Sequence, residues 1–252
     1  MRNINVLLAG ESWVSTMNHY KGFDHFSAAT YETGAAYLQK ALEAAADISF
    51  SYMPSHIAAE EFPYTLEELR KYDVVFLSDI GANTLLLSRK VFLEGKPEPN
   101  RLRLLQNWVE QGGALCMCGG YLSFAGIGAS AKYFRTPIEE ILPVSIYTFD
   151  DRIEAPEGVE VEIGEPDHPV IKGITGKWPV LLGYQETVLK QDALCLARTS
   201  YGHPLIAVRD YGKGRTMIWA SDIGPHWCPR TFAEWPGFTT LWQQAVRWLT
   251  GV

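Results

Sequence analysis

Short apolar runs that stop abruptly on glycine or polar residues constrain the fold of this chain more than any other feature. Four of them have little polar alternation: Ile4–Ala9, Asp73–Ser78, Ala114–Cys118 and Thr216–Ser221. A strand without alternation is buried on both faces, as in a parallel sheet. Helical patterns lie between the runs, and Ile48–Tyr52 adds another strand. This order predicts an α/β protein with a flavodoxin-like, doubly wound, mainly parallel sheet.

The helices expected around this sheet are marked by their apolar spacing and end signals. They cover Tyr31–Ala46, Thr65–Lys71, Arg101–Gln111 and Phe238–Leu249. The second opens on a capping-box pattern and the third ends at two glycines. The polar, aromatic segment His19–Thr30 is expected to be a loop, and such a loop could fold over the edge of the sheet.

The pattern changes after Pro143, where strands follow one another without long helices between them. The expected strands are Ser145–Phe149, Val159–Ile163, Gly183–Leu189, Ala193–Arg198 and Leu205–Asp210. Between Asp210 and Arg215, the dipeptides Tyr211-Gly212 and Lys213-Gly214 supply a turn. We expect one domain over residues 1–252, with an antiparallel, strand-rich elaboration at about 145–215 that either extends the core sheet or forms a second one.

Charge and cysteine content exclude several classes of function. The formal net charge is −7 and no lysine or arginine run occurs, which argues against nucleic-acid binding. No apolar stretch approaches the roughly 20 residues of a membrane helix. Four irregularly spaced cysteines indicate reduced thiols and a cytoplasmic protein. No metal or cofactor is expected, because His19, His25 and His226 lack the spacing of a ligand cluster.

The corner after the run Ala114–Cys118 is the strongest candidate for chemistry. The thiol of Cys118 is followed by two glycines and by Tyr121–Phe124, which can begin a helix. A sharp turn from strand to helix exposes the residue at the corner, where α/β enzymes hold a nucleophile. The alternative is that Cys118 is a small buried hydrophobic residue at a strand end.

Several motifs resemble those of a known group of proteins. They are Gly10-Glu11-Ser12-Trp13, Lys21-Gly22-Phe23-Asp24, Tyr31-Glu32-Thr33-Gly34, Gly119-Gly120-Tyr121-Leu122-Ser123-Phe124 and Ser221-Asp222-Ile223-Gly224-Pro225-His226-Trp227. Together they resemble the class I glutamine amidotransferase-like superfamily, and within it the branch called putative glutamine amidotransferases. The resemblance runs along most of the chain, and no reaction is firmly established for that branch.

The resemblance implies a cysteine nucleophile, Cys118, and a histidine base, His226. It also implies that the backbone amides of Gly81 and Gly119 stabilise an oxyanion. Glu11 is similar to a glutamate that contacts the cysteine in the intracellular-protease branch, although a capping role is the alternative.

The carboxylate that should orient the base departs from the family pattern. The glutamate expected two residues after His226 is replaced by Cys228, so the glutaminase triad is incomplete. Asp222 is the candidate to orient the imidazole instead. If no such partner exists, His226 is a loop or interface histidine.

Two functions therefore stay open, and whether the chain is an enzyme stays open with them. The first is an amidotransferase-like hydrolase using Cys118 and His226. The second is a non-catalytic protein that binds a small metabolite or a sugar. Six of eight tryptophans lie in the last third of the chain. Three alternative roles are open for them: stacking on a sugar, burial in a homo-oligomer interface, or packing of the core. With its triad incomplete, the chain should hydrolyse little free glutamine.

Overall fold

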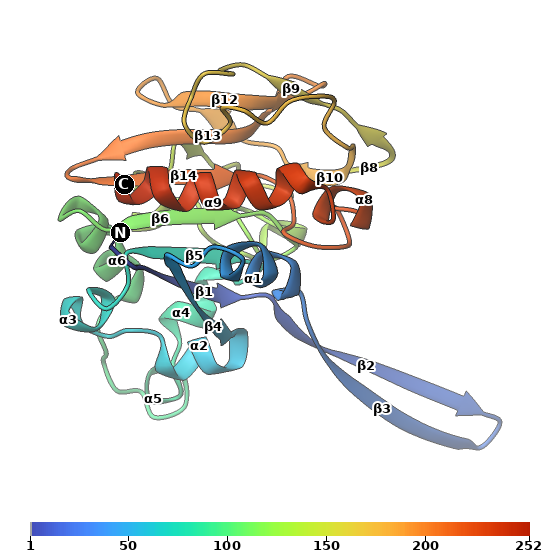
Figure 1. Ribbon diagram of the computed structural model, residues 1–252. Helices are drawn as coiled ribbons and strands as arrows, with labels where there is room; N and C mark the ends of the chain where they lie inside the picture. Colours follow the sequence, from blue (N-terminus) through green and yellow to red (C-terminus); the bar gives the residue numbers. More distant parts are fainter. Residues whose placement is uncertain (1) are drawn as a thin grey trace.

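The computed structural model describes residues 2–252 and is built on one eight-stranded sheet (Figure 1). In order across the sheet, the strands are β4 (Ile48–Pro54), β1 (Ile4–Gly10), β5 (Val74–Ser78), β6 (Ala114–Cys118), β14 (Gly214–Trp219), β13 (Pro204–Tyr211), β12 (Leu194–Thr199) and β9 (Val161–Ile163). The first five are parallel to one another and the last three are antiparallel. The predicted α/β class, with a mainly parallel sheet and added antiparallel strands, is confirmed.

The helices pack in two groups. In the first, α1 (Ala36–Glu43) lies against α9 (Pro236–Thr250), which also contacts β1, β5, β6 and β14. In the second, α4 (Ala82–Leu86) contacts both α2 (Ser55–Glu61) and α6 (Arg101–Glu110). Helix α6 also contacts α3 (Leu66–Leu69) and α7 (Pro137–Ile141). The remaining short elements are α5 (Arg89–Phe92), η1 (Ile127–Ala129) and α8 (Arg230–Ala233). The capping box predicted before α3 is present.

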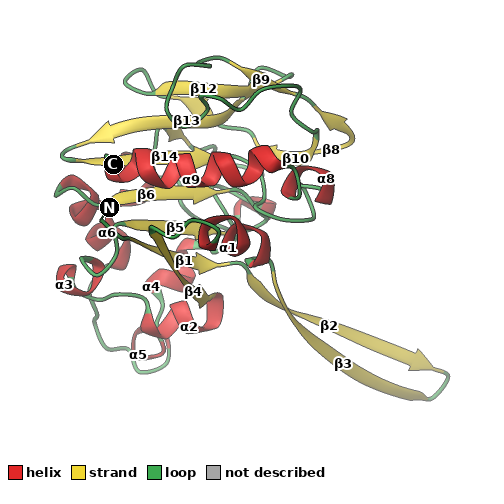
Figure 2. Ribbon diagram, in the orientation of Figure 1, coloured by secondary structure: helices red, strands yellow, loops and turns green. Residues whose placement is uncertain are grey.

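The segment expected to be a loop is instead a long hairpin, so this part of the prediction is wrong. Strands β2 (Ser12–Lys21) and β3 (Asp24–Thr33) pair along their whole length. The hairpin projects away from the body rather than folding over the sheet (Figure 2). The following helix consequently starts at Ala36 and not at Tyr31. The hairpin forms because the chain can turn tightly at Gly22, whose φ of 67° suits glycine.

The strand-rich elaboration is present, although its strands match the expected ones only in part, and β8 was not expected. Strands β9, β12 and β13 extend the main sheet, while β8 (Arg152–Val159) pairs with β10 (Leu181–Gln185) separately. The strand expected at Ser145–Phe149 is reduced to β7 (Val144–Ser145), which pairs with β11 (Val188–Leu189). The elaboration is therefore both an extension of the sheet and a set of small separate sheets.

The chain after β6 forms no helix at Tyr121–Phe124, contrary to expectation, and passes through turns instead. Side chains from other elements fix the backbone of this segment. The carboxylate of Asp79 accepts the N–H of Leu122 at 2.6 Å, and Asp151 accepts the N–H groups of Ala125 and Gly126 at 2.9 and 2.8 Å. Because these backbone groups find acceptors outside the segment, it is ordered without being helical.

Aromatic side chains fill the core around the last strand and helix. Four of the six late tryptophans are buried, namely Trp178, Trp219, Trp227 and Trp242. The rings of Trp219 and Trp242 meet at 5.8 Å between centroids. Core packing therefore accounts for most of them. Among the described residues, no helix is long and apolar enough to cross a membrane.

Candidate functional site

A cavity of about 530 Å³ lies beyond the carboxyl ends of the parallel strands. Ligands of open parallel sheets bind at this edge, because the loops that leave the strands meet there. Three carboxylates, three aromatic rings and several small or apolar residues line it: Glu11, Asp79, Asp222, Trp13, Tyr121, His226, Gly34, Leu122, Ile127, Gly224 and Pro225.

Two of the carboxylates are positioned by an unusual backbone. Glu11 follows β1 directly and Asp79 follows β5 directly, and their φ angles are 48° and 43°. A left-handed conformation is costly for a side chain that bears a Cβ, and such strain concentrates at functional sites. Gly10 makes the first turn possible, since a Cβ on it would lie 1.8 Å from the carbonyl oxygen of Ser78. Both turns direct carboxylates into the cavity.

Burial shifts the same two carboxyl groups toward their neutral form. Glu11 is only 6% exposed and accepts a hydrogen bond from the Ser78 hydroxyl. Burial, followed by the charges of Asp79 and Asp222, raises the pKa of Glu11 well above its usual range. Burial also raises the pKa of Asp79 to about 6. A carboxyl group that keeps its proton can donate a hydrogen bond, so these shifts favour a site with a donor as well as acceptors.

Asp222 and His226 form a hydrogen-bonded pair that also lines the cavity. The imidazole Nδ1 lies 2.9 Å from the Asp222 carboxylate, which also accepts the N–H of Trp227 at 3.0 Å. The hydrogen bond to Asp222 raises the pKa of His226. Such a carboxylate fixes the imidazole tautomer and its orientation. The residue suggested from the sequence to replace the missing glutamate is thus in hydrogen-bond contact with the histidine.

Tyr121 supplies an aromatic part of the cavity wall. Its ring meets the His226 ring edge-on at 4.8 Å between centroids. The guanidinium of Arg152 covers the Tyr121 ring at 4.4 Å from its centroid. The hydroxyl of Tyr121 donates a hydrogen bond to Glu154 at 3.1 Å. Because both supporting residues belong to β8, the elaboration takes part in building this wall.

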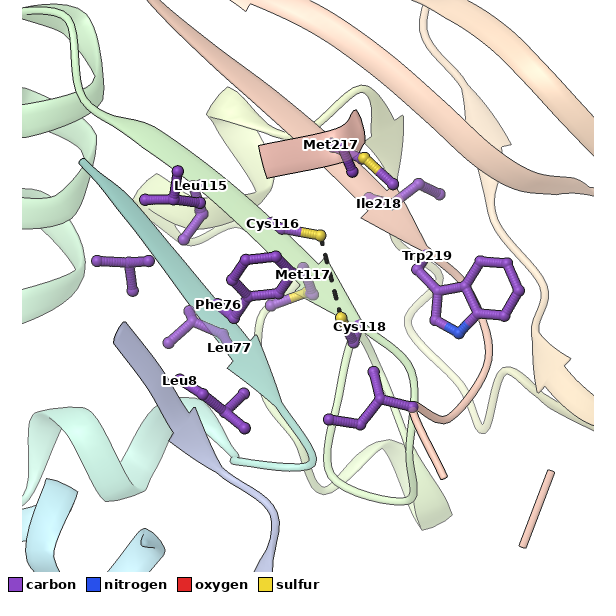
Figure 3. Packing of buried hydrophobic residues seen from close by; sticks show 14 of the residues in the cluster. Leu8, Phe76, Leu77, Leu115, Cys116, Met117, Cys118, Met217, Ile218 and Trp219 are labelled. Carbon is purple, nitrogen blue, oxygen red and sulfur yellow. Dashed lines mark hydrogen bonds between the residues drawn. The ribbon is translucent and has the colours of Figure 1, made fainter. Parts of the chain in front are cut away.

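Cys118 lies inside the sheet and not at the cavity surface (Figure 3). It is the last residue of β6, has no exposed surface, and its Sγ is 4.0 Å from that of Cys116. Burial, and then the neighbouring thiol, raises the pKa of Cys118 well above its usual range. A thiolate nucleophile requires the opposite shift and access to solvent.

The two backbone amides named from the sequence differ in their surroundings. The N–H of Gly119 donates to the carbonyl oxygens of Trp219 and Ser221, each at 2.8 Å. It is therefore engaged within the fold rather than directed at the cavity. Gly81 caps the first turn of α4, and it too is absent from the cavity lining.

The structure thus brings together Glu11, Asp222 and His226 and leaves Cys118, Gly81 and Gly119 outside the cavity lining. Sequence reasoning missed Asp79, Trp13 and Tyr121. Asp79 had a usable signal, since it follows its strand as directly as Glu11 follows β1.

His19 and His25 lie on the hairpin and do not line the cavity. Within residues 2–252, no three histidine, cysteine or acidic side chains are grouped closely enough to hold a metal ion.

Comparisons with solved structures support the whole fold. Two structures described as cytoplasmic proteins of Salmonella typhimurium match with TM-scores of 0.93 each. Their identities are 41% and 39%, and the matches cover 97% and 98% of this chain and 98% and 99% of theirs. A ThuA-like protein from Parabacteroides merdae matches with a TM-score of 0.59 over 99% of this chain and 90% of its own. At 12% identity, it shows the fold alone.

A search of the curated proteins finds no match. The family model described as putative glutamine amidotransferase, GATase1-like, matches residues 5–251. That match covers nearly all of the sequence and agrees with the resemblance carried by the strand-end motifs. The chain therefore belongs to the GATase1-like family of putative glutamine amidotransferases.

Proposed function

We propose that this protein binds a small, neutral, polyhydroxylated metabolite, such as a sugar or polyol, in the cavity beyond the parallel strands. The observation that carries the proposal is the convergence of Glu11, Asp79 and Asp222 beside the rings of Trp13 and Tyr121. Carboxylates accept hydrogen bonds from hydroxyl groups, while aromatic rings pack against the apolar face of a sugar ring. A cavity of about 530 Å³ has the size of a small-molecule site.

The protonation of the site favours a neutral ligand over a cation. Burial raises the pKa values of Glu11 and Asp79, so both acids hold a proton more tightly than they would in water. A protonated acid beside an ionised one presents a donor and an acceptor, and hydroxyl groups satisfy both. A bound cation would instead need both acids ionised, which burial opposes.

Binding to a panel of neutral monosaccharides and polyols tests the proposal, by calorimetry and thermal shift. Asp79→Asn and Tyr121→Ala should each weaken binding at least about 10-fold, because each removes a contact that orients the ligand. Cys118→Ala is the matched control and should bind as wild type does. If no member of the panel binds, or if Cys118→Ala alone abolishes binding, the proposal is wrong.

A second candidate function is a cysteine-dependent hydrolase, favoured by the Asp222–His226 pair. In this pair Asp222 supplies the orienting carboxylate that the sequence lacks two residues after His226. Against it stand the burial of Cys118 and the direction of its pKa shift. We expect no ammonia release from free glutamine. Release at amidotransferase rates that Cys118→Ala abolishes would establish the second function in place of the first.

We also propose a core topology, a domain count and a cellular location for this protein. The five parallel strands follow the chain order 2-1-3-4-5, which supports a flavodoxin-like core. The family match from residue 5 to 251 supports a single domain. Free cysteines and relatives described as cytoplasmic support a cytoplasmic location.

A further inference from the structure

The hairpin β2–β3 is the part of the molecule that the proposed function leaves unexplained. It projects from the body as a two-stranded ribbon with ten residues in each strand (Figure 1). A strand of that length spans about 33 Å. An isolated two-stranded ribbon is at best marginally stable in water. A ribbon of this length therefore needs contacts with another surface to stabilise it.

Large apolar side chains are exposed on both faces of this arm. The pairing register places Val14, Tyr20 and Tyr31 on one face and Trp13, Met17 and Phe26 on the other. All six are exposed, and Phe23 at the tip is fully so. A surface strand normally buries one face and solvates the other. A ribbon that is apolar on both faces suits insertion between two protein surfaces.

The charge pattern distinguishes the arm from the rest of the chain. Between Trp13 and Tyr31, the formally charged residues are Lys21 and Asp24, which face each other at the tip. The whole chain carries a net charge of −7. Two copies that met through their acidic bodies would repel, whereas two arms approach one another without a charge penalty. Edge strands that avoid association usually carry central charges, and this arm does not.

The exposed edges of the arm exclude a lipid bilayer as its cover. Strands β2 and β3 form a sheet of two, so the outer N–H and C=O groups of each strand lack a strand partner. In a bilayer these groups would have no hydrogen-bond partner, at a cost of several kcal/mol each. A protein surface can supply partners by pairing with the edge.

We propose that the arm is an oligomerisation element that packs against a second copy of this chain. The 22 residues from Ser12 to Thr33 match the 20 to 30 residues that each side contributes to a stable interface. A two-fold arrangement of identical arms is self-complementary. The root of the arm includes Trp13, which lines the cavity. Packing of the arm therefore fixes one wall of the ligand site.

The mass of the full chain in solution tests this inference, by light scattering and sedimentation velocity. The wild type at 100 µM should have at least twice the 28.2 kDa of one chain. The variant Tyr20→Ser/Phe23→Ser/Phe26→Ser should dissociate at least about 100-fold more readily, because large aromatic side chains dominate interface energetics. Oligomers of the wild type should persist in 1 M NaCl, since apolar contacts are not screened.

The matched control is Phe92→Ser/Leu93→Ser, which removes exposed apolar side chains in and beside α5, away from the arm. It should keep the wild-type mass. A monomeric wild type at 100 µM, or a triple variant that keeps the oligomeric mass, overturns the inference. Cosedimentation of a monomeric wild type with phosphatidylcholine vesicles would overturn it too and would indicate a membrane-binding arm.

Discussion

Strands β1 and β5 end in one way and β6 ends in another. After β1 and β5, the next residue turns into the left-handed region and carries a carboxylate into the cavity. At the end of β6, the thiol of Cys118 stays in the pleat of the sheet with no exposed surface. The strands lie side by side, with β5 between the other two. Their different endings decide which side chain can meet a ligand.

The comparison teaches that a shift of one residue relative to the strand end decides whether a side chain can reach the cavity. Glu11 and Asp79 lie one residue beyond their strands, whereas Cys118 is the last residue within its strand. The last strand residue is packed by both neighbouring strands, and the next one is free to turn outward. Burial favours the neutral form of both kinds of group, which lets a carboxyl group donate a hydrogen bond but leaves a thiol unreactive.

The largest effect that sharpens this comparison is expected in alkylation of the native protein. At pH 8, iodoacetamide should modify Cys118 at least about 1,000-fold more slowly than in urea, because access requires opening of the central sheet. Cys195 is only partly buried and serves as the internal reference. Peptide mass spectrometry over a time course measures both rates. Labelling of Cys118 as fast as Cys195 would place the thiol at an accessible site.

A large loss of stability is expected when the β1 corner is blocked. Gly10→Ala should lower the free energy of unfolding by about 3 kcal/mol or more, since the added Cβ would overlap the Ser78 carbonyl. Gly22→Ala is the matched control, because Gly22 also has a positive φ and no atom lies near its Cβ position. It should cost only about 1 kcal/mol. Equal losses in urea denaturation would contradict the tight corner.

A smaller effect concerns the pH dependence of stability. The pKa of Asp79 is raised to about 6 in the folded protein, so the folded state holds this proton more tightly than the unfolded state. Its contribution to stability is complete below about pH 4 and is lost as pH rises through about 6. Wild type should therefore lose about 1–2 kcal/mol relative to Asp79→Asn across that range. Asp151, whose pKa is also raised to about 6, contributes to both proteins and cancels. Parallel curves would show that Asp79 is not perturbed.

The smallest effect compares the two neighbouring thiols of β6. Cys118→Ala and Cys116→Ala should each cost about 1 kcal/mol, because both side chains are fully buried packing groups. Their losses in urea denaturation should agree within about 0.5 kcal/mol. A gain in stability from Cys118→Ala alone would instead indicate a strained functional residue.

The core of the fold was predictable because buried parallel strands leave a plain mark in the sequence. Runs such as Ile4–Ala9 are apolar on both faces, and strands β1, β5, β6 and β14 appear where such runs occur. The hairpin was missed for the opposite reason. Its strands bury neither face, so neither an apolar run nor a simple alternation marks them. Only the turn at Gly22 signalled a hairpin.

The candidate site was predictable to the extent that it depends on strand ends. Glu11, Asp222 and His226 follow core strands, and all three line the cavity. The depth of Cys118 was not predictable, because it depends on the path of the chain after β6. That path is set by distant partners such as Asp79 and Asp151, which no local pattern reveals.

The turns after β6 have a consequence for how the cavity can be altered. Their backbone is held through hydrogen bonds to Asp79 and Asp151, which lie outside the segment. The side chains of Leu122 and Ile127 line the cavity without making those bonds. The backbone of this segment thus depends on Asp79 and Asp151, whereas the side chains of Leu122 and Ile127 contribute only to the surface of the cavity. Substitutions at Leu122 and Ile127 can therefore change the cavity lining while the backbone stays constant, which makes this segment the natural place to redesign the site.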